Sequence, residues 1–89
     1  MKYIYSVWFR DVTRPDDDQD YEWVACFLVE AVSAKAAKAW ADHLSHRRER
    51  DDAVFLRSSL EEQRSSHLDT SGLPLVTDGV DSDDAHIGW

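Results

Sequence analysis

The chain opens with two segments, residues 3–9 and 23–31, in which apolar side chains occupy both sets of alternating positions. Aromatic and β-branched residues are frequent in them, which is typical of strands buried on two faces. Alternation in the first segment separates Tyr3, Tyr5, Val7 and Phe9 from Ile4, Ser6 and Trp8. In the second segment it separates Trp23, Ala25, Phe27, Val29 and Ala31 from Val24, Cys26 and Leu28. We predict two strands joined by a polar loop over residues 10–20.

A helix is predicted from Ser33 to about Arg50. The Ser33 hydroxyl can accept a hydrogen bond from the free N–H groups of the first helical turn. Apolar residues recur at helical spacing and form one stripe, consisting of Ala37, Trp40, Ala41 and Leu44. The residues expected to point away from this stripe are Lys35, Lys38, Asp42, His43 and Ser45.

Residues 53–60 return to a strand pattern, but a more polar one. Alternation places Val54, Leu56 and Leu60 on one side, and Phe55, Arg57 and Ser59 on the other. The polarity predicts an edge strand. Leu73, Leu75 and Val76 are a candidate for a short fourth strand, which Pro74 confines to an edge.

These elements predict an α+β fold, a ββαβ single layer of antiparallel sheet with one helix packed on one face. A strand–helix–strand connection prefers right-handed geometry, so the first strand is expected between the second and the third. The topology resembles half of a ferredoxin-like arrangement, and a likeness of topology carries no function. We expect residues 1–60 to form the core domain and residues 61–89 an acidic, partly ordered C-terminal extension.

One helix can shield only one face of a sheet that is apolar on both. We therefore expect the chain to be a protein-binding module, most simply a homodimer joined through the helix-free face. The terminal residues Ile87 and Trp89 follow a polar stretch, which indicates docking on that face or on a neighbour. The candidate partner contacts are Ile4, Trp8, Val24, Leu28, Ile87 and Trp89, and alternation alone leaves open which of the two faces the helix covers.

The formal charge of −8 and the pI near 4.7 argue against nucleic acid and anionic membranes as partners. One basic patch, Arg47, Arg48 and Arg50, lies at the predicted end of the helix, where cations complement the helix dipole. It leaves a second hypothesis, a nucleic-acid-associated regulator that binds through these arginines. No stretch is long and apolar enough to span a bilayer.

No catalytic, cofactor or metal site is predicted. His43 and His46 have the spacing of a helical metal pair, but two ligands do not make a site, so a metal-dependent enzyme is the third and weakest hypothesis. The acidic run at residues 16–20 opens like a calcium loop, yet Tyr21 stands where the turn glycine belongs. Cys26 is the single cysteine, which excludes an intrachain disulfide and favours a cytoplasmic protein with a buried, inert thiol.

Overall fold

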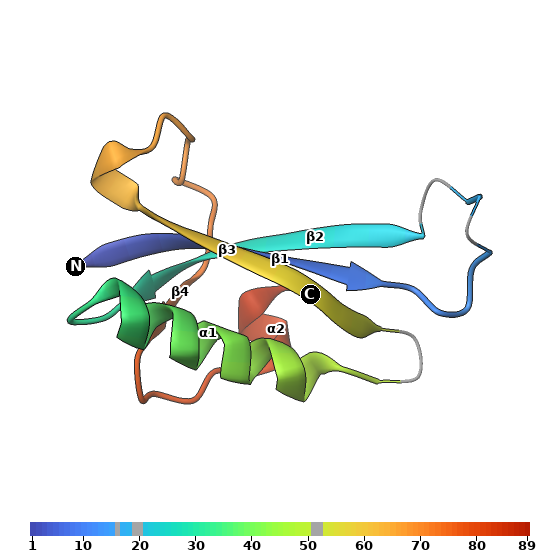
Figure 1. Cartoon of the computed structure of the whole chain (residues 1–89). Coiled ribbons are helices and arrows are strands. Elements are labelled where there is room, and N and C mark those ends of the chain that lie inside the picture. Colours follow the sequence, from blue (N-terminus) through green and yellow to red (C-terminus); the bar gives the residue numbers. More distant parts are fainter. Residues whose placement is uncertain (16, 19–20, 51–52) are drawn as a thin grey trace.

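A computed structural model describes residues 1–15, 17–18, 21–50 and 53–89 of the chain. It shows a single sheet with helix α1 lying against one face (Figure 1). Part of the acidic run expected at residues 16–20 lies outside the described residues. The elements are β1 (Lys2–Arg10), β2 (Glu22–Glu30), α1 (Ala34–Arg48), β3 (Val54–Glu62), the 3₁₀ turn η1 (Gln63–Ser65), β4 (Leu75–Thr77) and the short helix α2 (Asp84–Ile87).

The strand order is β3-β1-β2-β4, which confirms the predicted place of the first strand between the second and third. β1 is antiparallel to both β2 and β3. The short fourth strand is also confirmed, at the edge beside β2. Because β4 runs parallel to β2, the complete sheet is mixed and not purely antiparallel.

Helix α1 begins as predicted, with the Ser33 hydroxyl accepting a 3.1 Å hydrogen bond from the Ala36 backbone N–H. It ends at Arg48, where His46, Arg47 and Arg48 occupy the last turn. Ala37, Ala41 and Leu44 of the predicted stripe are buried, whereas Trp40 is only half-buried. Ser45 is buried with the stripe, which differs from the prediction that it points away.

The main core lies between α1 and the face of the sheet formed by the odd-numbered residues of β1 and β2. Tyr5, Val7, Phe9, Phe27 and Val29 of this face are completely buried. Tyr5 contacts both Asp42 and Ser45 of α1, which identifies this face as the one that the helix covers.

A β-bulge in β3 changes which side chains share a face. Trp8 of β1 is opposite Arg57, but Phe9 is opposite Phe55, so Leu56 is an extra residue. Phe55 therefore lies on the helix side of the sheet, with its ring 6.4 Å from that of Phe9. Ser58 and Leu60 share this side, because they are opposite Val7 and Tyr5. The predicted grouping of Val54 and Leu56 with Leu60, away from Phe55, is wrong because simple alternation assumes no bulge.

The chain after β3 returns to the core at two points. Val76 of β4 and Ile87 of α2 are both buried. Helix α2 is capped by Asp83, whose side chain accepts a 2.8 Å hydrogen bond from the His86 backbone N–H. Gly88 ends it in the left-handed conformation, with φ of 85°.

Candidate functional site

The helix-free face of the sheet is formed by the even-numbered residues of β1 and β2 and by the residues of β3 opposite them. Strand register places Ile4 beside Leu28, Ser6 beside Cys26, and Trp8 beside Val24. Arg57, Ser59 and Glu61 are opposite Trp8, Ser6 and Ile4, so they lie on the same face.

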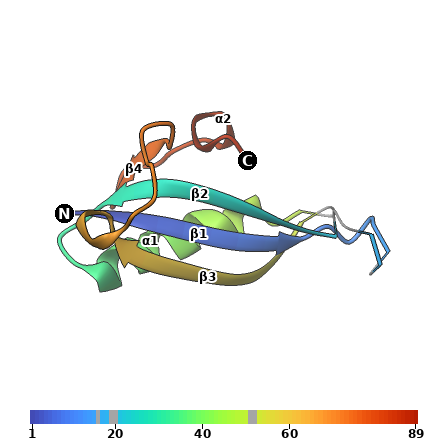
Figure 2. The same ribbon diagram turned by 90° about the horizontal axis from the view of Figure 1, so that it is seen from above.

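One end of this face is covered by the chain itself. The segment between β3 and β4 lies on the side of the sheet opposite α1, at the end where β1 begins (Figures 1 and 2). Ile4 and Leu28 at this end are only 2% and 7% exposed. Of the six predicted partner contacts, these two therefore offer almost no surface to another molecule.

The rest of the helix-free face is accessible. Val24 is 52% exposed, and Trp8 and Cys26 are half-buried. We call this part the open surface and define it as the side chains Trp8, Val24, Cys26, Arg57, Ser59 and Glu61.

Arg57 shields Trp8 on the open surface. Its guanidinium lies 4.8 Å from the centre of the Trp8 ring, a cation–π contact. The same group donates to Oε1 of Glu22 at 3.3 Å. The Arg57 and Glu22 side chains are 57% and 44% exposed, so the ion pair is one that water weakens.

The C-terminal residues pack on the helix side of the sheet. The Trp89 ring meets those of Phe9 and Phe27 edge-on, at 5.7 and 5.6 Å between centroids. Its indole N–H donates a 2.9 Å hydrogen bond to Asp84, the main reason why the pKa of Asp84 is lowered. Trp89 and the buried Ile87 thus dock on the helix side of the sheet, and the predicted docking of the C-terminus on the helix-free face is wrong.

The basic patch faces the acidic C-terminal segment. Arg47 donates to Asp81, and this hydrogen bond lowers the pKa of that carboxyl group. Arg50 pairs with Asp84 at 3.0 Å. The Arg48 guanidinium lies 5.6 Å from the centre of the Trp23 ring. All three arginines therefore have partners within the chain.

A polar cluster between α1 and the sheet was not anticipated. Asp42 accepts hydrogen bonds from Tyr5 at 2.6 Å, Ser58 at 2.6 Å and Lys38 at 2.9 Å. Ser45 lies 3.0 Å from the Tyr5 hydroxyl. Asp42 therefore does not point away from the sheet, as its place in the helical pattern predicted. Tyr5 and Ser45 are completely buried, whereas the Asp42 and Lys38 side chains are 27% and 46% exposed, so the cluster joins helix to sheet and reaches the surface at Lys38.

The side chains considered for metal or nucleophile chemistry contact other residues of the chain. Nδ1 of His46 lies 2.7 Å from Glu49, and the His43 ring lies 5.2 Å from that of Trp40. No three potential ligands gather into a metal site among the residues that the structure describes. Cys26 is a free, half-buried thiol 3.3 Å from the Ser6 hydroxyl. In the same described part of the chain, no helix is long and apolar enough to cross a bilayer.

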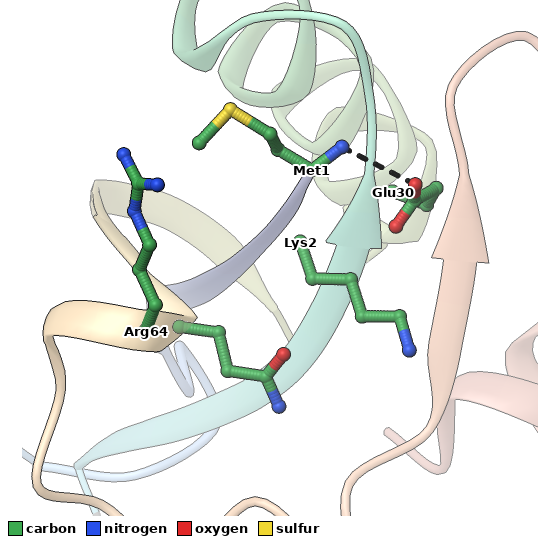
Figure 3. A pocket seen from close by; sticks show the side chains of 5 residues that line it. Met1, Lys2, Glu30 and Arg64 are labelled. Carbon is green, nitrogen blue, oxygen red and sulfur yellow. Dashed lines mark hydrogen bonds and ion pairs between the residues drawn. The ribbon is translucent and has the colours of Figure 1, made fainter.

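One shallow hollow lies at the end of the sheet where β1 begins. Figure 3 shows this hollow of about 290 Å³, lined by Met1, Lys2, Glu30, Gln63 and Arg64. The Met1 amino group pairs with Glu30 at 3.2 Å, and Arg64 pairs with Glu62 at 2.7 Å. Three of its charged groups, those of Met1, Glu30 and Arg64, are thus paired within the chain, and we assign no ligand to it.

Comparison with known proteins gives no family for the chain. No family model matches it, and no curated protein or solved structure matches it significantly.

Proposed function

We propose that the protein is a small, acidic, non-enzymatic binding module that associates with a second copy of itself through the open surface. The observation that carries this proposal is the exposure of Val24 beside Trp8 on a sheet face that no helix covers. Contiguous apolar side chains on such a face are typical of interaction sites.

A second copy fits the charges of this surface. Arg57 and Glu61 belong to it, and Glu22 lies at its border. A surface that carries both signs can pair with itself across a twofold axis, the commonest symmetry of soluble oligomers. The chain's net charge of −8 makes a polyanionic partner unfavourable.

The test is sedimentation velocity of the full chain from low to high micromolar concentration. We expect the mass to rise from 10.3 kDa toward twice that value. The V24D/R57E variant should dimerise at least about tenfold more weakly, because it adds two carboxylates to the open surface and removes the positive charge of Arg57 from it.

The matched control is V32D/K35E, which changes the formal charge by the same amount in the turn before α1 and in the first turn of that helix. Val32 is 89% exposed and Lys35 is also exposed, so this variant should dimerise like the wild type. A wild-type chain that stays at 10.3 kDa throughout the range contradicts the proposal, as does equal weakening of both variants.

The nucleic-acid hypothesis is less well supported, because Arg47 and Arg50 already pair with Asp81 and Asp84. It requires that single-stranded DNA be retained at low salt and lost when the three arginines become alanine. Cytoplasmic residence belongs to the proposal as well, supported by the single free thiol of Cys26. A metal-dependent activity would require stoichiometric metal in the purified protein.

A further inference from the structure

β3 is the long free edge of the sheet. The strands built from described residues end at β3, with nine residues, and at β4, with three. Figure 2 shows β3 at one margin of the sheet with no strand beyond it. An edge strand presents unpaired backbone N–H and C=O groups to whatever lies alongside.

The beginning of this edge is obstructed. The bulge at Leu56 interrupts the regular ladder, and the side chain of Glu49 accepts a 3.1 Å hydrogen bond from the Phe55 backbone N–H. The part available for regular pairing is therefore residues 57–62.

The charges along this part of β3 are complementary to themselves. Arg57, Ser59 and Glu61 share the helix-free face, with Ser59 midway between the two charges. When two copies of the strand lie antiparallel with Ser59 opposite Ser59, each Arg57 is opposite Glu61 of the other copy. A shift by two residues leaves Arg57 opposite Ser59 or Gln63 and removes both charge pairs. Opposite charges directly across a pair of strands stabilise it, so the pattern favours one register.

We propose that the second copy binds along residues 57–62 of β3, antiparallel and centred on Ser59, so that the two sheets become continuous. This inference rests on the proposed self-association and assigns it to the β3 margin of the open surface. Stacking of two open surfaces face to face is the competing arrangement. It is restricted because the chain itself covers the end of the face at Ile4 and Leu28.

Pairing requires Arg57 to change partner. In the single copy Arg57 reaches across Trp8 to Glu22, and in the pair it turns toward Glu61 of the second copy. Both members of the present ion pair are about half exposed, so one weak pair replaces another. Glu61 accepts a 2.9 Å hydrogen bond from the Ser66 hydroxyl at Oε1, and its second carboxylate oxygen can accept from Arg57 of the second copy.

Exchanging the two charges tests the register. R57E and E61R alone each place like charges opposite one another and should weaken dimerisation about tenfold or more, measured by sedimentation velocity. R57E/E61R restores both opposite pairs in reverse and should return the dissociation constant to within about threefold of the wild-type value. Dimerisation that remains weak in R57E/E61R, although this variant melts like the wild type, overturns the register.

Disulfide trapping tests the location. Directly opposed residues of antiparallel strands have Cα atoms about 4.5–5.5 Å apart, within the range of a disulfide. In a C26S background, S59C should form a covalent dimer under mild oxidation. V24C, which reports stacking of the open surfaces, should crosslink no faster than V32C, which lies on neither contact.

The outcomes separate this inference from the proposed function. Faster crosslinking of V24C than of S59C overturns edge pairing and leaves self-association standing. A wild-type chain that is monomeric throughout, with all three variants crosslinking equally slowly, overturns both.

Discussion

The hydroxyl of Tyr5 donates a 2.6 Å hydrogen bond to Asp42, and this bond ties the middle strand of the sheet to the middle of α1. The same carboxylate also accepts from Ser58 of β3, so one acidic side chain connects three elements. The cluster formed by Tyr5, Lys38, Asp42, Ser45 and Ser58 is therefore the main polar connection between helix and sheet that the structure describes.

Replacing Tyr5 with phenylalanine should destabilise the protein by about 1.5–3 kcal/mol, the usual contribution of a hydrogen bond to a charged group. The ring and its burial are kept, so the loss reports the hydroxyl group. Urea unfolding of Y5F and the wild type measures this loss of unfolding free energy. The control is Y3F on the same strand and face, where the hydroxyl has only a 3.7 Å contact with the Met1 sulfur. A Y5F variant no less stable than Y3F contradicts the assignment.

Acid should remove part of the stability through Asp42. Burial by itself raises the pKa of this carboxyl group, but hydrogen bonds from Ser58, Tyr5 and Lys38 outweigh it and leave the pKa lowered. A carboxyl group whose pKa is lower in the folded state stabilises fully above its unfolded pKa, and this contribution is lost as the pH falls through the folded value. Wild-type protein should lose more unfolding free energy than D42N between about pH 5 and 2. Curves of unfolding free energy against pH that run parallel for the wild type and D42N would contradict this.

Raising the pH above the usual pKa of tyrosine should destabilise the folded protein through Tyr5. Burial, helped by the hydrogen bond to Asp42, raises the pKa of the Tyr5 hydroxyl well above its usual value. Above about pH 10 the unfolded chain ionises this tyrosine while the folded chain does not, so stability falls as the pH rises. The fall should be shallower in Y5F than in Y3F, as measured by urea unfolding between about pH 9 and 11. Equal slopes would show that Tyr5 ionises normally in the folded protein.

The Trp89 ring should contribute measurably to stability. W89A removes contacts with Phe9 and Phe27 as well as the hydrogen bond to Asp84, and should cost about 2 kcal/mol, less than a fully buried tryptophan. W89F keeps a ring and loses the hydrogen bond, so its cost should be about half as large. V80A, a change at a 56% exposed position of the same segment, serves as the control. A W89A variant that unfolds like V80A would mean that the docking is not stabilising.

The two ion pairs of the C-terminal segment, Arg47–Asp81 and Arg50–Asp84, should contribute differently to the free energy of unfolding. Asp81 is exposed and pairs with Arg47 alone among the described side chains, so D81N should change stability little, and less still in high salt. Asp84 also accepts the indole hydrogen bond of Trp89, so D84N should be the more destabilising change. Urea unfolding in low and high salt compares them. The reverse order would contradict the described role of Asp84.

The sequence predicts the framework of this fold because its strongest signals are local. Residues 3–9 and 23–31 are apolar on both alternating faces apart from Ser6 and Glu30, and their aromatic and β-branched side chains favour strands. The Ser33 cap depends only on the next three residues. The apolar pair Leu75 and Val76 after Pro74 was sufficient to predict an edge strand.

The remaining features depend on contacts between distant residues. The bulge at Leu56 changes the partners of β3 without any glycine to mark it. Asp42 looks solvent-facing in the helical pattern, and only the approach of Tyr5 and Ser58 turns it inward. The side of the sheet on which Trp89 docks follows from where the turn before α2 directs the chain, which the aromatic ending alone does not encode. For the open surface, the sequence left open which face the helix covers, and it did not predict the segment after β3 that covers Ile4 and Leu28.

The two margins of the sheet are unequal, and this limits how large an assembly can grow. β4 offers only three residues and is preceded by Pro74, whereas β3 offers the longer stretch of residues 57–62. Once two copies share their β3 strands, the outermost strands on both sides are the short ones, and a third copy finds no template of useful length. Joining along β3 therefore terminates at a pair and does not propagate into a fibre.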